Sequence, residues 1–427
     1  MTHFGIVCLG ATGHLNTLLP LGQELKQRGH AVTFFSAPSV QAKVEAAGLT
    51  FHNAYPPSVE GCQQEGQQES KDKTAQQNGN LKNLQQTLQR FAEIAEARLQ
   101  TIPEVIREQT IDALIVDFSA LEGGTIADHL GIPYITVCCV LPFYQDPAIP
   151  PVFTTWQYNR APWATLRNQI AYRILNRLAR PTWQTIARYR QLWQLPICEK
   201  ANDVFSELAI ITRHIPEFEF PRQLPAHFHF TGPFHQSAER EAVPFPFDRL
   251  NDKPLIYASM GTLQNRSRSV FYAIAKSCAN LEAQLVISLG GGLEPTALPD
   301  LPGNPLVVKY APQLELLQKA TLNITHAGLN TVLESLSYGV PMVAIPITDD
   351  QPGIAARIVW TGTGELIPFS RINVSKLKPA IEQVLTQASY KKNAVRLQNA
   401  IHQTNGVSHA CNIIEQAVLT CKPVNSF

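Results

Sequence analysis

Short apolar runs alternate with segments of helical periodicity along the chain. Residues 4–9 (FGIVCL) and 31–36 (AVTFFS) are apolar runs of strand length. The segment between them carries leucines at helical spacing and ends at Gly29, as expected for a helix C-terminus. A strand, a helix and a strand in this order form a βαβ unit, which predicts a parallel sheet.

The same pattern recurs further along the chain. Residues 111–120, a helix to His129 and residues 132–140 repeat it in the first half. The second half carries a helical segment at 330–339 and apolar runs at 254–260, 283–292, 305–312, 322–328 and 341–347. Two such halves predict an α/β protein with two Rossmann-like, doubly wound domains that face each other.

Length and composition agree with two domains. The 427 residues exceed one core of ordinary size, and 44% of them are hydrophobic. A stretch rich in proline and charge separates the halves. We therefore expect an N-terminal domain at 1–235, a linker at 236–253, a C-terminal domain at 254–405 and a C-terminal helix within 406–427.

Charge and segment composition limit the partners and the location. The formal net charge is +1, which gives no bias toward nucleic acid. The start of the chain does not resemble a signal peptide, and no stretch reaches the roughly 18 apolar residues of a membrane span. We expect a cytoplasmic protein.

The most informative segment is residues 310–351. An apolar strand ends at His326, a tight turn follows at Ala327 and Gly328, and a helix starts near Asn330. Such a turn aims backbone N–H groups and the positive end of the helix dipole at the strand's carboxyl end, which favours anions. Gly328 leaves room for a phosphate, and His326, Asn330 and Thr331 add donors. The chain has no Asp-x-Asp pair, so we expect a diphosphate to be held without a metal.

Flanking residues fit the rest of a nucleotide sugar. Glu334 shares a helix face with Asn330 and can accept both ribose hydroxyls. Asp350 and Gln351 follow the next strand, where they can bond sugar hydroxyls. Tyr310 can stack on a base, and Gln313 can read its edge. Each of these residues alone is more often a packing or solvated residue, so the prediction depends on their joint spacing.

This segment resembles the donor-binding signature of glycosyltransferase family 1. Tyr310 and Leu329 stand where plant members usually carry Trp, and Thr331 stands for Ser. The pattern is otherwise met at Ala311, Pro312, Gln313, His326, Gly328, Asn330, Glu334, Pro341 and Gln351.

The resemblance implies a GT-B fold, a UDP-sugar donor, no cofactor and no metal. It implies that Tyr310 stacks on uracil, Gln313 contacts uracil or ribose, and Glu334 holds the ribose. By the same resemblance, Asp350 and Gln351 hold glucose. The residues assigned to the phosphates are His326, Asn330, Thr331 and, after an earlier strand, Thr262. The resemblance also implies that the last helix crosses back to the N-terminal domain.

The N-terminal half offers a catalytic base. Inverting glycosyl transfer needs a group that takes the acceptor proton, and histidine has a suitable pKa of roughly 6.5. His14 follows the turn after the first strand, and Asp117 ends another strand, so both reach the same sheet edge. Family members use such a pair, with the aspartate fixing the imidazole tautomer. Without that role, His14 would lie beside a helix N-terminus and Asp117 would be a helix cap.

The acceptor is the least determined part. The segments HFGIVCLG, DKPLIYASMGTLQ and DQPGIAARIV resemble the zeaxanthin glucosyltransferases of carotenoid-making bacteria. They imply transfer of glucose from UDP-glucose to a hydroxyl of a lipophilic acceptor, such as a carotenoid. A broad-acceptor enzyme acting on phenolic or macrolide molecules is the alternative.

The composition of residues 147–198 gives a further indication of how the acceptor is reached. They contain no Asp or Glu but seven Arg and four Trp. Two interpretations stay open: peripheral contact with an anionic membrane, or a pair of helices capping the acceptor cleft.

A nicotinamide-dependent reductase is a remote alternative. The turn GATGHLN has Asn16 where a dinucleotide fingerprint carries its third glycine. The second strand ends without the acidic residue that would hold a ribose. Tyr272 and Lys276 form a Tyr-x-x-x-Lys pair, but in the other half of the chain.

Overall fold

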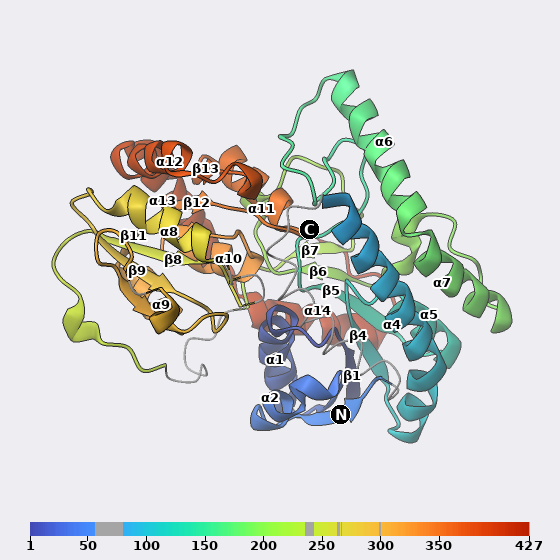
Figure 1. Ribbon diagram of the computed structural model, residues 1–427. Coiled ribbons are helices and arrows are strands. Elements are labelled where there is room, and N and C mark those ends of the chain that lie inside the picture. Colours follow the sequence, from blue (N-terminus) through green and yellow to red (C-terminus); the bar gives the residue numbers. More distant parts are fainter. Residues whose placement is uncertain (56–79, 235–242, 263–264, 266, 299, 427) are drawn as a thin grey trace.

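The computed structural model describes the chain apart from residues 56–79, 235–242, 263–264, 266, 299 and 427. In the described part, the strands form two parallel sheets, one in each half of the chain (Figure 1). Parallel strands with helices between them confirm the predicted α/β class. None of the described helices combines the length and the apolarity needed to cross a membrane.

The N-terminal sheet has the strand order β3-β2-β1-β4-β5-β6-β7, with every described pair parallel. Its order reverses direction between β1 and β4, where open α/β sheets bind ligands at the carboxyl ends of their strands. The strands are β1 (His3–Val7), β2 (Ala31–Ser36), β3 (Thr50–Asn53), β4 (Ala113–Asp117), β5 (Tyr134–Cys138), β6 (Ile210–Thr212) and β7 (Phe228–Phe230).

Both faces of this sheet are buried because its side chains alternate between two cores. Phe4, Ile6 and Ile115 face one core, whereas Val7 and Val116 face the other. The helices are α1 (Thr12–Gln27), α2 (Gln41–Ala46), α4 (Asn80–Glu108), α5 (Gly123–Leu130), α6 (Pro162–Leu178) and α7 (Arg180–Leu192), with short 3₁₀ turns η1 (Pro38–Val40), η3 (Ala201–Val204) and η4 (Pro216–Phe218).

The C-terminal sheet repeats the same winding. Its order is β10-β9-β8-β11-β12-β13, with the reversal between β8 and β11. The strands are β8 (Leu255–Ser259), β9 (Gln284–Ser288), β10 (Leu306–Val308), β11 (Ala320–Thr325), β12 (Met342–Ala344) and β13 (Gly364–Leu366). The helices are α8 (Arg268–Cys278), α9 (Gln313–Lys319), α10 (Leu329–Ser337), α11 (Gln351–Trp360), α12 (Val374–Thr386) and α13 (Ala388–His402), with the 3₁₀ turns η6 (Phe247–Arg249), η7 (Pro295–Ala297) and η8 (Phe369–Arg371).

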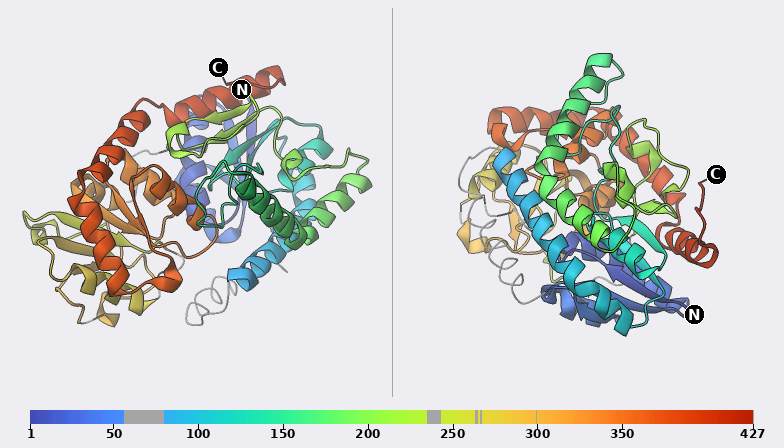
Figure 2. Two further views of the ribbon diagram at one scale, coloured as in Figure 1. Left: turned by 90° about the horizontal axis from the view of Figure 1, so that it is seen from above. Right: turned by 90° about the vertical axis from the view of Figure 1, so that its right-hand side faces the viewer.

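The last helix, α14 (Gly406–Thr420), lies against the N-terminal sheet and α1, far in sequence from both (Figure 2). Its Glu415 accepts from Arg28 at 2.7 Å and contacts the ring of His30 at 2.9 Å. Part of the expected linker, residues 236–242, lies outside the described residues, and the domain boundaries stay a prediction.

Candidate active site between the two sheets

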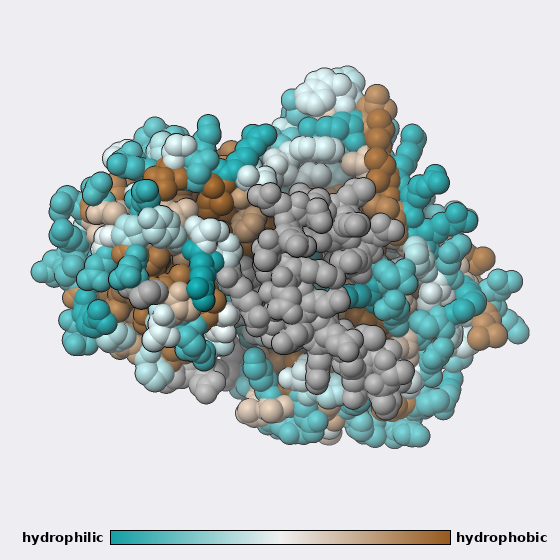
Figure 3. Space-filling model, in the orientation of Figure 1, coloured by the Kyte–Doolittle hydropathy of each residue, from teal (hydrophilic) through white to brown (hydrophobic). Residues whose placement is uncertain are grey.

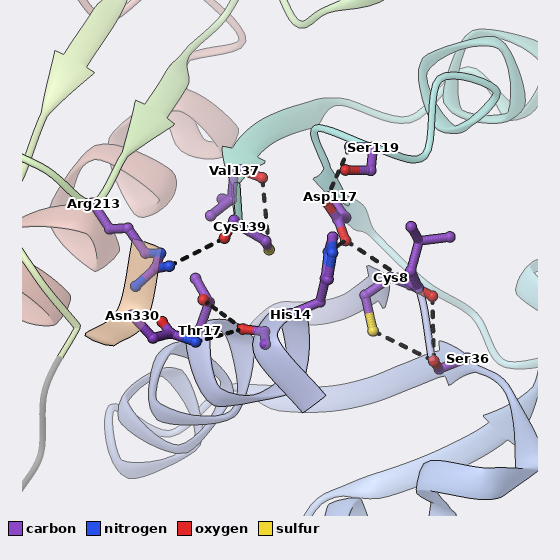
Figure 4. A network of polar contacts seen from close by, with 12 residues as sticks. Cys8, His14, Thr17, Ser36, Asp117, Ser119, Val137, Cys139, Arg213 and Asn330 are labelled. Carbon is purple, nitrogen blue, oxygen red and sulfur yellow. Dashed lines mark hydrogen bonds and ion pairs between the residues drawn. The ribbon is translucent and has the colours of Figure 1, made fainter. Parts of the chain in front are cut away.

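His14 and Asp117 meet at the reversal point of the N-terminal sheet. His14 lies in the first turn of α1, directly after β1, and Asp117 is the last residue of β4. Because β1 and β4 are neighbours, their carboxyl ends bring the two side chains together. His14 Nδ1 lies 2.5 Å from Asp117 Oδ2 (Figure 4). Nε2 is then the ring nitrogen left to accept a proton.

Burial and charge oppose each other in this pair. Burial by itself lowers the pKa of His14, but the charge and hydrogen bond of Asp117 outweigh it and leave the pKa raised. Burial alone would raise the pKa of Asp117, yet His14 and the backbone N–H groups of Ser119 and Leu9 hold it lowered. The pair therefore favours an anionic aspartate that supports a protonated imidazole, as a general base requires.

The Asp117 carboxylate has a full set of hydrogen-bond donors. Ser119 N–H donates to Oδ1 at 3.0 Å and Leu9 N–H to Oδ2 at 3.4 Å. Ligand atoms of His14, Asp117 and Cys139 lie within 4.8 Å of one another, close enough to be tested as a metal site. Burial, however, raises the pKa of the Cys139 thiol well above its ordinary value. A protonated thiol and a carboxylate engaged by three donors fit a hydrogen-bonded dyad better than a ligand set.

His326 occupies the reversal point of the C-terminal sheet. It follows β11, and its ring lies between Gly261 after β8 and Gly328 before α10. A Cβ built on either glycine would come within 2.6 Å of ring atoms, so both positions need glycine. Thr262 follows Gly261 at the same edge and is exposed. The His326 ring therefore fills part of the space beside Gly328 where the sequence predicted a phosphate.

Burial lowers the pKa of His326 to about 4, so the ring is neutral near pH 7. Its Nδ1 is buried and has no hydrogen-bond partner among the described residues. The ring is instead hydrogen-bonded to the backbone of Ser259. A neutral ring then offers Nδ1 as an acceptor, and donation to a phosphate requires protonation. A bound dianion would favour that protonation by its charge.

The residues predicted for the nucleoside form one group. Gln313 begins α9, and its amide donates to Glu334 on α10 at 2.5 Å. Thr331 lies 3.4 Å from the same amide nitrogen. Glu334 is 1% exposed, so a ribose could contact its carboxylate only after the Gln313 side chain moved away from it. Tyr310, beside the half-buried Ala311, keeps 49% of its surface exposed, as a stacking platform would.

The residues predicted for the sugar are engaged by backbone groups. Leu141 N–H, from the N-terminal half, donates to Asp350 Oδ2 at 2.8 Å. Gln351 Oε1 accepts from the N–H groups of Ile347 at 2.9 Å and Thr348 at 3.2 Å. Both residues lie at the carboxyl end of β12, but their contact with a sugar stays a prediction.

Asn330 links the two edges. Its Nδ2 donates to the carbonyl of Gly13, next to His14, at 3.3 Å (Figure 4). The start of α10 therefore lies next to the His14–Asp117 pair, and the first backbone N–H groups of a helix have no partner within the helix. A diphosphate at this helix end would place the adjoining sugar carbon next to His14.

Arg213 is a site residue that sequence reasoning missed. It follows β6, is 2% exposed, and donates through Nη2 to the carbonyl of Cys139 at 3.2 Å (Figure 4). Its Nε has no partner among the described residues. Burial lowers its pKa to about 10, although the negative charges of Glu334 and Asp350 raise it. The guanidinium therefore stays charged near pH 7. The available signal was a basic residue directly after a short apolar run.

The sequence matches a family model across this region. Residues 163–411 match the model described as "UDP-glucoronosyl and UDP-glucosyl transferase". The chain belongs to the UDP-glycosyltransferase family. It is therefore an enzyme that transfers a sugar, and a UDP-sugar donor with a small acceptor fits the family.

Full-length relatives of this UDP-glycosyltransferase agree with that assignment. It is 32% identical to the zeaxanthin glucosyltransferase of Pseudescherichia vulneris over 100% of both chains. It is 30% identical to the zeaxanthin glucosyltransferase of Pantoea ananas, over 100% of this chain and 98% of that one. A crystal structure of the calicheamicin glycosyltransferase CalG4 superposes with a TM-score of 0.76 at 20% identity, over 99% of this chain and 100% of that one. This likeness confirms the GT-B fold.

Proposed function

We propose that this UDP-glycosyltransferase moves glucose from UDP-glucose to a hydroxyl of a lipophilic acceptor, with inversion and without a metal. The observation that carries the proposal is the His14–Asp117 pair facing the start of α10, with Asn330 bonded to the backbone beside His14. A base on one side and an anion site on the other are the two groups that a single displacement needs.

The reaction is one displacement. His14 Nε2 takes the acceptor's proton while the acceptor oxygen attacks the anomeric carbon from the side opposite UDP. The new carbon–oxygen bond forms as the bond to the diphosphate breaks, and the electron pair leaves with UDP. Asp117 stabilises the imidazolium, which afterwards releases its proton to solvent.

Negative charge grows on the departing diphosphate, and two groups are placed to stabilise it. The first is the N-terminus of α10, with its backbone N–H groups and helix dipole. The second is Arg213, a buried cation within electrostatic range of Glu334 and Asp350. Preorganised positive charge in a water-poor site stabilises a transition state more than the same charge in water does.

A carotenoid such as zeaxanthin is the proposed acceptor. The support is the full-length likeness to two zeaxanthin glucosyltransferases at 32% and 30% identity. Glucose as the sugar has the same support, together with Asp350 and Gln351 at the carboxyl end of β12.

A broad-acceptor enzyme is the second candidate. Matches at lower identity include the 4'-demethylrebeccamycin synthase of Lentzea aerocolonigenes at 22%, over 95% of this chain and 97% of that one, and the demethyllactenocin mycarosyltransferase of Streptomyces fradiae at 26%, over 97% of this chain and 86% of that one. An acceptor panel of carotenoids, phenols and macrolides separates the two candidates.

The deciding test is mass spectrometry of the products formed from UDP-glucose and zeaxanthin in detergent with EDTA. We expect a glucosylated carotenoid. UDP-glucose binding without that product would move the acceptor to the second candidate. Activity that EDTA abolishes and added metal restores would contradict the metal-free mechanism.

A further inference from the structure

The outward face of α6 is apolar. Trp163, Leu166, Ile170 and Ile174 are 58%, 54%, 47% and 51% exposed. Their spacing of three and four residues places them on one side of the helix, which we call the α6 stripe. Figure 3 shows the hydrophobic side chains as a column at the edge of the molecule where Figure 1 places α6. Contiguous exposed apolar surface of this kind marks an interaction site.

The opposite face holds α6 in place. Asn168 donates to the carbonyl of Pro147 at 3.1 Å, and the Tyr172 hydroxyl donates to that of Ile149 at 3.2 Å. Asn176 exchanges amide hydrogen bonds with Gln145 at 2.7 and 3.1 Å. The helix is therefore fixed by polar contacts on its inner side, and these contacts turn the α6 stripe outward.

Arginines surround the stripe without carboxylate partners. Arg188 and Arg190 of α7 pair with Glu96 and Asp128. Among the residues that the structure describes, no carboxylate pairs with the other arginines of residues 147–198, which are Arg160, Arg167, Arg173, Arg177 and Arg180. The guanidinium of Arg167 lies over the rings of Trp156 and Trp163, at 4.2 and 5.3 Å. Because residues 147–198 contain no acid, the charged side chains that this segment itself contributes are all positive.

We propose that the α6 stripe docks on an anionic lipid surface. The four apolar side chains enter the interface between headgroups and acyl chains, and the arginines contact lipid phosphates. A second copy of the chain would bring the same arginines against each other, so charge complementarity favours the lipid surface.

Docking would bring the active site to the membrane. Residues 139–150 connect the two regions: Leu141 N–H bonds Asp350, while Gln145, Pro147 and Ile149 bond α6. An acceptor dissolved in the bilayer would then reach the sheet edge that carries His14 without crossing water. This last link rests on the proposed function, whereas docking itself does not.

The test is cosedimentation of the full chain with vesicles of phosphatidylcholine, or of phosphatidylcholine and phosphatidylglycerol in equal parts. We expect binding to the anionic vesicles only, weakened by salt. The double variant Leu166→Glu/Ile170→Glu should bind at least about tenfold more weakly. In Arg173→Gln/Arg177→Gln, affinity should fall about fivefold for each arginine, which corresponds to ~1 kcal/mol per basic residue at an anionic surface.

Leu419→Glu is the matched control, because Leu419 is 86% exposed on α14 and should leave binding unchanged. Failure of the wild-type chain to sediment with anionic vesicles would overturn the proposal, and so would unchanged binding of the Leu166→Glu/Ile170→Glu variant. Light scattering that shows a dimer converted to monomer by this variant would identify a second copy as the occupant and overturn it too. Transfer to a water-soluble phenol without vesicles separately measures the enzyme's activity.

Discussion

At the scale of single residues, the site depends on opposing electrostatic influences on His14. Asp117 raises the pKa of this imidazole, whereas burial and Arg213 lower it. Because the proposed mechanism uses the neutral ring as the base, kcat/KM should rise with pH as His14 loses its proton. The raised pKa places this limb of the profile above the ordinary histidine value of roughly 6.5.

Asp117→Asn should move that limb to lower pH, because the amide no longer stabilises the imidazolium. It should also reduce kcat by about 10²–10⁴-fold, since the tautomer is no longer held. pH profiles of kcat/KM check both effects, and UDP affinity by calorimetry should stay at the wild-type value. A limb that does not move would contradict the dyad.

Arg213→Met should shift the same limb in the opposite direction. Removing the cation raises the pKa of His14, so the limb moves to higher pH. Loss of the charge facing the leaving group should lower kcat by about 10²–10³-fold, with Arg213→Lys retaining part of the rate. A purely structural role would lower the melting temperature without moving the pH profile, and that outcome would exclude the proposed role.

At the scale of elements, α14 belongs to the N-terminal core although it ends the chain. Six of its residues are buried in the cluster that contains β1 and α1: Val407, Ala410, Cys411, Ile413, Ile414 and Ala417. The amphipathic pattern of the helix does not specify which sheet it covers. Contacts with α1 and β5, both far away in the sequence, decide it.

Ile414→Ala should therefore destabilise the N-terminal half. Ile414 is fully buried, and its truncation should cost about 2–5 kcal/mol in transfer and cavity terms. Leu419→Ala on the same helix, 86% exposed, should cost less than about 0.5 kcal/mol. Denaturant titrations of the two variants provide the comparison, and similar midpoints would contradict this packing.

At the scale of the whole molecule, a buried ion pair joins the two halves beneath the site. Arg357 of α11 donates through Nε to Glu219 Oε1 at 2.8 Å, and both side chains are nearly inaccessible. Burial would raise the pKa of Glu219, but Arg357, His214 and Arg222 hold it well below its ordinary range. Gly353 N–H also donates to the carbonyl of Val152 at 2.7 Å. These contacts set how the two sheet edges face each other.

Glu219→Ala should lower the unfolding free energy by about 3–5 kcal/mol, because Arg357 would stay buried without its counter-charge. Glu294→Ala breaks the exposed pair with Lys309 and should leave the unfolding free energy nearly unchanged, because solvent screens this pair. Differential scanning calorimetry compares the two, and equal melting temperatures would show that the pair does not hold the halves together.

Periodicity predicted the principal strands, such as β1, β4, β8 and β11, because their apolar runs are long enough to read. It did not identify β3, β6, β7 or β13, because each of these strands lies in a run of only a few apolar residues. His14, Asp117, His326 and Asn330 were predicted to lie at strand ends and helix starts, where parallel topology alone brings side chains to one edge.

The sequence by itself determined the two parallel sheets and the chemical groups at their carboxyl ends, because both follow from local patterns and chain order. Only the tertiary structure decided which of these groups meet. It set Asn330 against Gly13, bonded Asp350 to Leu141, bonded Arg213 to Cys139 and turned the α6 stripe outward. Such contacts join residues tens to hundreds of positions apart, and no local periodicity encodes them.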